Sequence, residues 1–335
     1  MKVLLVRQSA PGAYPTFIDS DFQILSEAYE TREIEFAGLK DVPRLLAEVY
    51  WADCTFSWFG KLHAFFAVLF SKAMRRRGIV VAGDDDVTNS VVAGRPYGLC
   101  AHPVKKWFAY TLFHFADLVI PISKFGLLEA INNAKAKPKR TKLIYHGFDS
   151  DRFRRMATVS RRPRTVITVA HINWENVERK GLRLFVESAR LLEDVTFTIV
   201  GPALDASFQA LQETSPPNVA FAGSLVGDDL VMALNRAAVY VQASEWESFG
   251  CSVAEAMLCE CVPVVSRRGG LPEVVGEAGF YVDRLEFKEL AAKIEEALRH
   301  SEMGRQARRR IVENFPLERR KLALLGAVER VLSGG

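Results

Sequence analysis

Short apolar runs rich in β-branched residues alternate with longer helical segments along this chain, and the alternation restarts near residue 164. In the first half the runs are residues 2–6, 33–36, 54–56, 79–82, 118–121 and 142–145, with a helix expected over 62–76. In the second half they are residues 164–169, 196–200, 219–222, 239–242 and 262–266, with a helix over 182–192. Continuous apolar strands joined by helices are typical of parallel sheets covered on both faces. The pattern predicts an α/β protein with two Rossmann-like, doubly wound domains that face an interdomain cleft.

A basic, Ser/Thr-containing connector over residues 149–163 separates the two halves. We therefore expect an N-terminal domain over residues 1–157 and a C-terminal domain over residues 158–316. An amphipathic segment lies at about 317–332, and we expect residues 317–335 to pack back on the first domain. With 335 residues and 49% hydrophobic composition, the chain has enough apolar mass for two cores.

Positive charge is concentrated in the first half of the chain. Residues 1–157 carry 22 Lys and Arg against 16 Asp and Glu, while the rest of the chain has a small acidic excess. The basic clusters lie at residues 75–77, at 105–106 and along 135–142, and in the simplest interpretation they are solvated helix ends. The alternative is a basic face that contacts an anionic membrane. The basic and aromatic stretch 102–115 is either an ordinary helix or a patch that touches lipid. We expect no nucleic-acid partner.

Five cysteines without disulfide or metal-ligand spacing indicate reduced thiols. The apolar part of the N-terminus is too short for a signal peptide, and the most apolar window, residues 58–70, is shorter than the roughly 20 residues of a spanning helix. We therefore expect a cytoplasmic protein, with a peripheral position on the inner membrane face as an alternative.

Two glutamates, Glu247 and Glu255, flank a turn at Gly250 in the segment ASEWESFGCSVAEAM. We expect a helix to begin at Cys251, and the unpaired N–H groups of a helix N-terminus bind phosphate. The two carboxylates can accept hydrogen bonds from sugar hydroxyls on either side of that phosphate. Lys180 follows the first strand of the second half, where it can neutralise a diphosphate in the same cleft. The combination favours a nucleotide-sugar site, whereas the alternative for each residue alone is an ordinary surface side chain.

These residues also carry a resemblance to a known family. Lys180-Gly181, residues 197–201, ESFGCSVAEAM, PVV and GGLPE resemble the retaining glycosyltransferases of family four, which have the GT-B fold and an E-x7-E signature. Weaker matches occur at 116–123 and 142–153. The resemblance is strong from about residue 165 to residue 282, and it implies that the first domain is on the acceptor side.

The resemblance implies a role for each matching residue of the donor site. Lys180 would bind the donor diphosphate, Glu255 the ribose, and Glu247 the donor sugar, with Lys180 and Glu247 as the catalytic residues. His171 stands where the family usually has an arginine, so the charge there would depend on pH. Backbone near 223–225 would border the base. The remaining donor-binding residues that the resemblance implies are Ser248, Phe249, Gly250, Cys251 and Ser252.

The first domain departs from the family pattern at two places. The loop after the first strand has a single glycine, Gly12, and the position where the family often has a histidine reads Asp84, Asp85 and Asp86. We take these four residues as acceptor-side candidates. Although Asp84 and Asp86 satisfy a D-x-D metal pattern, we expect a carboxylate there to orient the acceptor or cap the next helix, and we expect no metal or other cofactor.

The resemblance predicts a metal-independent, retaining hexosyltransferase. It would move a hexosyl group from a nucleoside-diphosphate sugar to a hydroxyl of a glycan, a lipid-linked acceptor or a small molecule. Catalysis would come from stabilising the departing diphosphate, with no protein nucleophile. Two alternatives stay open: an epimerase or phosphorylase with the same fold, and a catalytically silent subunit that binds a sugar nucleotide.

Overall fold

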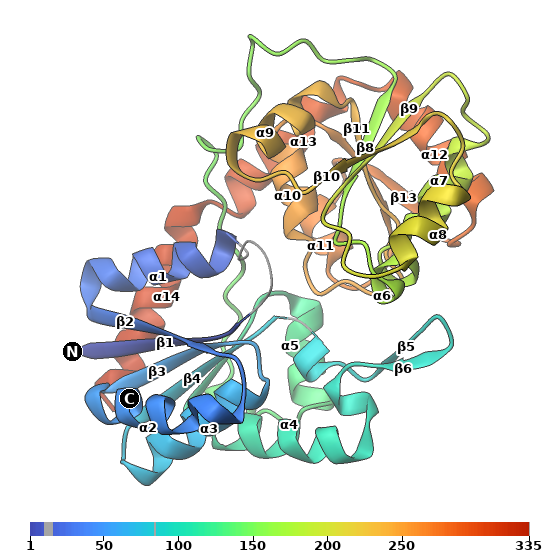
Figure 1. Cartoon of the computed structure of the whole chain (residues 1–335). Helices are drawn as coiled ribbons and strands as arrows, with labels where there is room; N and C mark the ends of the chain where they lie inside the picture. Colours follow the sequence, from blue (N-terminus) through green and yellow to red (C-terminus); the bar gives the residue numbers. More distant parts are fainter. Residues whose placement is uncertain (10–15, 84, 335) are drawn as a thin grey trace. The chain divides into compact units, whose positions relative to one another are not determined.

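The chain forms two compact units in the computed structural model, which describes residues 1–9, 16–83 and 85–334 (Figure 1). The first unit comprises Met1–Gly147 together with Leu317–Gly335, and the second comprises Phe148–Pro316. Each unit contains one parallel sheet covered by helices. Residues 148–157 belong to the second unit, although the sequence analysis placed them in the first. The Met156 N–H and the Arg155 guanidinium both donate to Asn235 Oδ1, at 2.7 and 2.9 Å, and so attach this segment to the second unit.

The first unit is built on a five-stranded sheet in the order β2-β1-β3-β4-β7, in which every neighbouring pair is parallel. Its strands are β1 (Lys2–Gln8), β2 (Glu30–Phe36), β3 (Cys54–Trp58), β4 (Arg77–Ala82) and β7 (Leu118–Pro121). The helices of this unit are α1 (Thr16–Ala28), α2 (Val42–Trp51), α3 (Leu62–Ala73), α4 (Pro103–Phe115), α5 (Lys124–Asn132) and α14 (Leu317–Leu332). Figure 1 shows α2 and α3 on one face of the sheet and α1 with α14 on the other. Because helices cover both faces, β3, β4 and β7 are buried along almost their whole length, whereas the edge strand β2 is largely polar.

A buried ion pair joins the C-terminal helix to the start of the first unit. Arg320 on α14 donates two hydrogen bonds of 2.6 Å to the carboxylate of Asp21 on α1, and it also donates to the Tyr145 carbonyl oxygen at 2.8 Å. Both charged side chains are almost completely buried. A buried charge is stable only when it is paired and fully hydrogen-bonded, so this contact holds α14 against α1 in one register.

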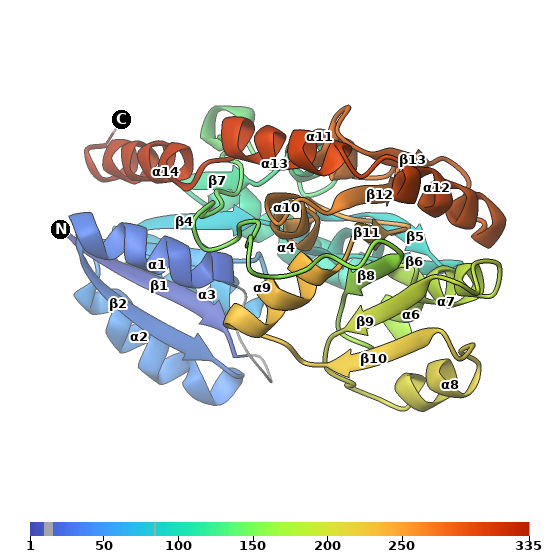
Figure 2. The same ribbon diagram turned by 90° about the horizontal axis from the view of Figure 1, so that it is seen from above.

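The second unit has a six-stranded parallel sheet in the order β10-β9-β8-β11-β12-β13, and Figure 2 shows the strands fanned out in this order. The strands are β8 (Thr165–Val169), β9 (Thr196–Val200), β10 (Val219–Gly223), β11 (Val239–Gln242), β12 (Val262–Ser266) and β13 (Phe280–Val282). The helices are α6 (Trp174–Arg179), α7 (Leu182–Ala189), α8 (Ser207–Glu213), α9 (Gly227–Arg236), α10 (Cys251–Leu258), α11 (Leu271–Val275), α12 (Phe287–Arg299) and α13 (Met303–Asn314). The strand order reverses between β8 and β11, which is where ligands bind in open α/β sheets.

Some elements differ from the sequence prediction. Residues 142–145 were predicted as a strand, but they form an extended segment whose neighbour Thr141 makes only an isolated bridge to Val119. Two backbone bonds, from the Lys142 N–H to the Val119 oxygen and from the Ile144 N–H to the Pro121 oxygen, are too few for a strand. The sequence prediction did not include the antiparallel hairpin of β5 (Ser90–Val92) and β6 (Arg95–Tyr97), nor the edge strand β13. Each of these strands has three residues, too few to show an apolar period.

Candidate active site

The candidate site lies at the carboxyl ends of β8 and β11, which are neighbouring strands in the second unit. The chain that leaves β8 carries His171 and then α6, which ends next to Lys180. The chain that leaves β11 carries Glu247 and then enters α10. Because parallel strands end at the same edge of a sheet, residues 67 positions apart in the sequence come into contact here.

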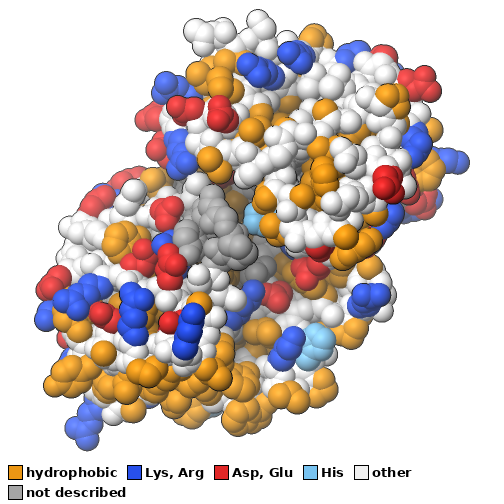
Figure 3. Space-filling model, in the orientation of Figure 1, with side chains coloured by type: hydrophobic (Ala, Val, Ile, Leu, Met, Phe, Trp, Pro, Cys, Tyr) orange, Lys and Arg blue, Asp and Glu red, His pale blue; other side chains and the backbone are white. Residues whose placement is uncertain are grey.

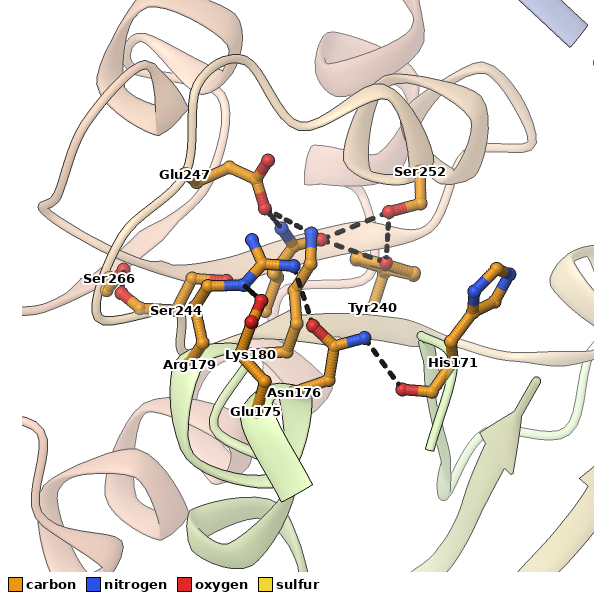
Figure 4. Close-up of polar contacts among 11 residues, drawn as sticks. His171, Glu175, Asn176, Arg179, Lys180, Tyr240, Ser244, Glu247, Ser252 and Ser266 are labelled. Carbon is orange, nitrogen blue, oxygen red and sulfur yellow. Dashed lines mark hydrogen bonds and ion pairs between the residues drawn. The ribbon is translucent and has the colours of Figure 1, made fainter. Parts of the chain in front are cut away.

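Lys180 and Glu247 form the central ion pair of this site, between Lys180 Nζ and Glu247 Oε2 (Figure 4). Their side chains are 17% and 11% exposed. Gln242, the last residue of β11, donates from Nε2 to the same carboxylate oxygen at 2.5 Å. One carboxylate oxygen therefore receives two donors, which fixes its position. A partly desolvated ion pair of this kind contributes more than an exposed one, since water screens it less.

A chain of hydrogen bonds continues from Gln242 to the start of α10. Tyr240 donates to Ser252 Oγ at 2.8 Å, and Ser252 donates to Gln242 Oε1 at 3.1 Å. Burial raises the pKa of the Tyr240 hydroxyl, so this group keeps its proton and acts as a donor. The chain links the first turn of α10 to the Glu247 carboxylate, and Figure 4 shows its labelled members converging on one point.

Glycines set the backbone on both sides of the ion pair. Gly181 follows Lys180 with φ of 71°, and a Cβ there would lie 2.3 Å from the Ala243 carbonyl oxygen. Gly250 precedes α10 with φ of 102°, and a Cβ there would lie 2.8 Å from a methyl group of Leu271. Both positions are left-handed and crowded, so a larger residue would displace the loops that present Lys180 and Glu247.

The first turn of α10 lies where the sequence analysis predicts a phosphate seat. Helix α10 begins at Cys251, and both Cys251 and Ser252 are half-buried rather than covered. Glu255 lies one turn further along the same helix and is also half-buried. By contrast, Phe249 is only 1% exposed, and its ring stacks on Phe148 with centroids 6.0 Å apart. The Phe249 side chain belongs to the core, so its backbone alone is available to a ligand.

His171 lies two residues beyond the end of β8, with an exposed side chain. Its backbone oxygen accepts a hydrogen bond of 3.0 Å from Asn176 Nδ2. Although the residue is exposed, its surroundings desolvate part of the ring, which lowers the pKa of His171, and the nearby Lys180 lowers it further. The imidazole is therefore neutral at neutral pH, so Lys180 is the stronger positive charge here.

Of the four acceptor-side candidates in the first unit, the structure describes Asp85 and Asp86. Gly12 and Asp84 lie outside the described residues. Asp86 is fully buried and accepts the Gly60 N–H at 2.5 Å, while Asp85 pairs with Lys61 at 3.1 Å. The partners of both carboxylates, Gly60 and Lys61, directly precede α3. Within the described ranges no group of His, Cys, Asp and Glu side chains is arranged to hold a metal ion.

Sequence reasoning missed Gln242. It closes an apolar strand, VYVQ, in which it is the only side chain able both to donate and to accept through an amide. A polar residue at the carboxyl end of a buried parallel strand points towards the ligand edge of the sheet. That position was the signal that could have identified it.

The geometry agrees with the comparisons to known proteins. Residues 163–300 match the profile of the family described as "Glycosyl transferases group 1". A sulfoquinovosyl transferase from Arabidopsis thaliana, SQD2, is 30% identical over 152 residues, which are 42% of this chain and 29% of that protein. A probable sucrose-phosphate synthase from Thermosipho melanesiensis is 29% identical over 102 residues, covering 29% and 23% of the two chains. This chain thus spans less than a third of each of these relatives.

Solved structures resemble the whole chain. HepE from Anabaena, in complex with UDP and glucose, has a TM-score of 0.79 at 18% identity and covers 98% of this chain and 99% of its own. Sucrose-phosphate synthase from Thermosynechococcus elongatus has a TM-score of 0.80 at 16% identity, with full coverage of both chains. At these identities the likeness establishes the fold. It confirms the prediction of a GT-B fold with two Rossmann-like units. Residues 163–300 are similar to the group 1 glycosyltransferase family.

Proposed function

We propose that this chain is a retaining glycosyltransferase of family four that transfers a hexosyl group from a nucleoside-diphosphate sugar to a hydroxyl acceptor. The observation that carries the proposal is the Lys180–Glu247 pair, held in front of the first turn of α10 at the switch point of the second sheet. An ammonium group and a helix N-terminus together suit a diphosphate. A carboxylate beside them suits the hydroxyls of the attached sugar.

The proposed donor is a UDP-sugar. HepE from Anabaena has been solved with UDP and with UDP-glucose, and this chain shares its fold. In the proposed complex Lys180 and the Cys251 and Ser252 N–H groups hold the diphosphate, and Glu255 accepts from the ribose hydroxyls. Glu247 accepts from the hexose, and His171 lies beside the phosphates as a neutral donor.

In the proposed reaction the bond between the anomeric carbon and the diphosphate oxygen breaks, and the bond to the acceptor oxygen forms on the same face. The acceptor proton passes to the departing phosphate, so no protein base is required. Lys180 and the α10 N-terminus stabilise the charge that develops on the leaving group, which lowers the barrier because these groups are already oriented. The reaction as proposed needs no metal ion.

The proposed acceptor is a hydroxyl of a glycan, a lipid or a small molecule, bound on the side of the first unit that carries Asp85 and Asp86. A reducing, cytoplasmic location is part of the proposal, supported by five cysteines that are all free thiols.

The test begins with a thermal-shift screen of UDP-, GDP- and ADP-sugars, because a bound ligand stabilises the folded state by mass action. We expect a UDP-sugar to raise Tm most. NMR of the product should then show the donor's anomeric configuration, with activity preserved in excess EDTA. An inverted product contradicts the proposed mechanism, and loss of activity in EDTA contradicts metal independence. Isomerised or phosphorolysed donor without acceptor would favour the epimerase or phosphorylase, and binding without turnover would favour a silent subunit.

A further inference from the structure

Helices α3 and α4 of the first unit present apolar side chains outward. Figure 3 shows hydrophobic side chains gathered along the lower edge of this unit, where Figure 1 places α2, α3 and α4. The exposed apolar residues of α3 and α4 are Leu62 (37%), Leu69 (48%), Val104 (78%), Trp107 (63%) and Phe115 (53%). We refer to this set as the α3–α4 face. Single exposed apolar residues are ordinary, but a group on adjacent helices marks an interaction surface.

Helical spacing explains why these residues form one surface. Residues 62, 65, 66 and 69 recur at three- and four-residue intervals on α3, and residues 104, 108, 111 and 115 do so on α4. Side chains at these intervals lie in one stripe along a helix. The two stripes meet where the rings of Phe65 and Phe108 lie 4.5 Å apart. Trp107 lies beside this junction, with its ring 6.0 Å from that of Phe108.

The charges that α3 and α4 themselves carry are basic, and the nearby carboxylates are already paired, Asp117 with Lys72 and Asp85 with Lys61. Neither α3 (LHAFFAVLFSKA) nor α4 (PVKKWFAYTLFHF) contains an aspartate or a glutamate. Lys105 is exposed in the first turn of α4, next to Lys106, whose ammonium lies 5.3 Å from the centre of the Tyr110 ring. An exposed arginine, Arg75, follows the end of α3. A basic rim around an apolar face is complementary to a surface of uniform negative charge.

The dimensions of the helices determine how such a surface could meet lipid. Helices α3 and α4 have 12 and 13 residues, whereas a spanning helix needs about 20. Across the part of the chain that the structure describes, no helix has the length and apolar character needed to cross a bilayer. Exposed Trp, Tyr and Phe side chains flanked by Lys are typical of helices that lie in the plane of the interface.

We propose that the α3–α4 face docks the first unit on an anionic lipid monolayer. Val104, Trp107 and Phe115 enter the boundary between headgroups and acyl chains, and Lys105 and Lys106 contact the acidic headgroups. An apolar face with exposed aromatic side chains and neighbouring lysines, on helices too short to span a bilayer, suits the interface of an anionic lipid monolayer. This proposal does not depend on the proposed reaction.

The test is flotation of the purified chain with vesicles of phosphatidylcholine alone and of phosphatidylcholine with 30 mol% phosphatidylglycerol, at roughly 0.1 M ionic strength. We expect binding to the anionic vesicles only. Val104→Ser/Trp107→Ser should abolish it, and Lys105→Gln/Lys106→Gln should weaken it about tenfold or more, since each cation near the surface contributes about fivefold. Leu322→Ser is the matched apolar control, because Leu322 is 66% exposed on α14 of the same unit.

Each outcome decides the proposal. Selective loss of binding in the two α4 variants, with binding intact in Leu322→Ser, supports it. No binding of the unaltered chain to anionic vesicles, or equal binding of all variants, overturns it. A dimer by light scattering that dissociates in the Val104→Ser/Trp107→Ser variant, without vesicle binding, would assign the face to a second copy instead. Unchanged Tm values in all variants ensure that a loss of binding is not a loss of folding. Vesicle binding needs no sugar nucleotide, so failure here leaves the proposed reaction untouched.

Discussion

Replacing each member of the Lys180–Glu247 pair should change UDP affinity in opposite directions. In the free protein the ammonium of Lys180 is already bound to the carboxylate of Glu247, which competes with an incoming diphosphate. Lys180→Met removes the cation and leaves the carboxylate facing the phosphates. Glu247→Gln removes the competitor and its negative charge but keeps an acceptor for the sugar. Lys180→Met should therefore weaken UDP binding, whereas Glu247→Gln should leave it equal or stronger.

The magnitude follows from the burial of the pair. A charge-assisted hydrogen bond in a partly desolvated site contributes about 1.5–3 kcal/mol, which corresponds to a roughly 10- to 150-fold weaker Kd for Lys180→Met. The same substitution leaves a Glu247 carboxylate that is 11% exposed and that still accepts from Gln242 Nε2. The free energy of unfolding should then fall by about 1–3 kcal/mol. Turnover with the intact donor should fall in both variants, because both residues are proposed to contact it.

Isothermal titration with UDP at fixed ionic strength measures the affinities, and urea denaturation followed by the fluorescence of the second unit measures the stability. Lys293→Met is the matched control, since Lys293 pairs with Glu296 on the outer helix α12. Its UDP affinity should equal that of the unaltered chain. The reasoning is refuted if Lys180→Met and Lys293→Met bind UDP alike, or if Glu247→Gln loses affinity as Lys180→Met does.

Three further perturbations have defined outcomes. Asp21→Ala should destabilise the first unit by about 3–5 kcal/mol, because it leaves Arg320 buried without a counter-charge. Hydrogen exchange of the α14 amides should then accelerate, and an exchange rate equal to that of the unaltered chain would contradict the assigned role. Burial lowers the pKa of His63 from 6.5 to about 4, so between these pH values the unfolded state binds a proton that the folded state does not. The free energy of unfolding should therefore fall by up to about 3 kcal/mol as the pH drops from about 6.5 to about 4. His63→Gln should flatten that part of the pH–stability curve. Gln242→Leu should lower kcat with UDP affinity nearly unchanged, because Gln242 positions the donor-site carboxylate; an equal loss of UDP affinity would indicate a collapsed site.

The sequence predicted the strands of both sheets well where their residues are apolar without interruption. β11 and β12 are such runs up to their last residue, and burial on both faces of a sheet requires that composition. The run at 142–145 is also largely apolar but is not a strand of the sheet, because two backbone bonds to β7 are all that connect it there among the described residues. An apolar composition indicates that a segment is buried, but it does not show how many hydrogen-bonding partners the segment has.

The site could be predicted only in part for a related reason. The spacing between Glu247 and Glu255 and the turn at Gly250 are local, so they are visible in the sequence. The contact of Lys180 with Glu247 depends on β8 and β11 being neighbours, which strand order determines. The placement of Gln242 below the same carboxylate is a matter of side-chain direction at one strand end. Both the Lys180–Glu247 contact and the position of Gln242 depend on the tertiary structure, so the local sequence does not show them.

The bridge between Phe148 and Pro316 has a consequence for how this architecture can be rearranged. The Phe148 N–H donates to the Phe315 oxygen at 2.9 Å, so the second unit starts and ends at the same place and is topologically an insertion in the first. Consecutive Cα atoms are about 3.8 Å apart, so the flanking residues Gly147 and Leu317 are separated by a gap that a few residues can close. Excision of 148–316 as a transplantable cassette therefore needs a short splice and no new fold, and recombination between homologous genes at these two codons would exchange the whole second unit in a single event.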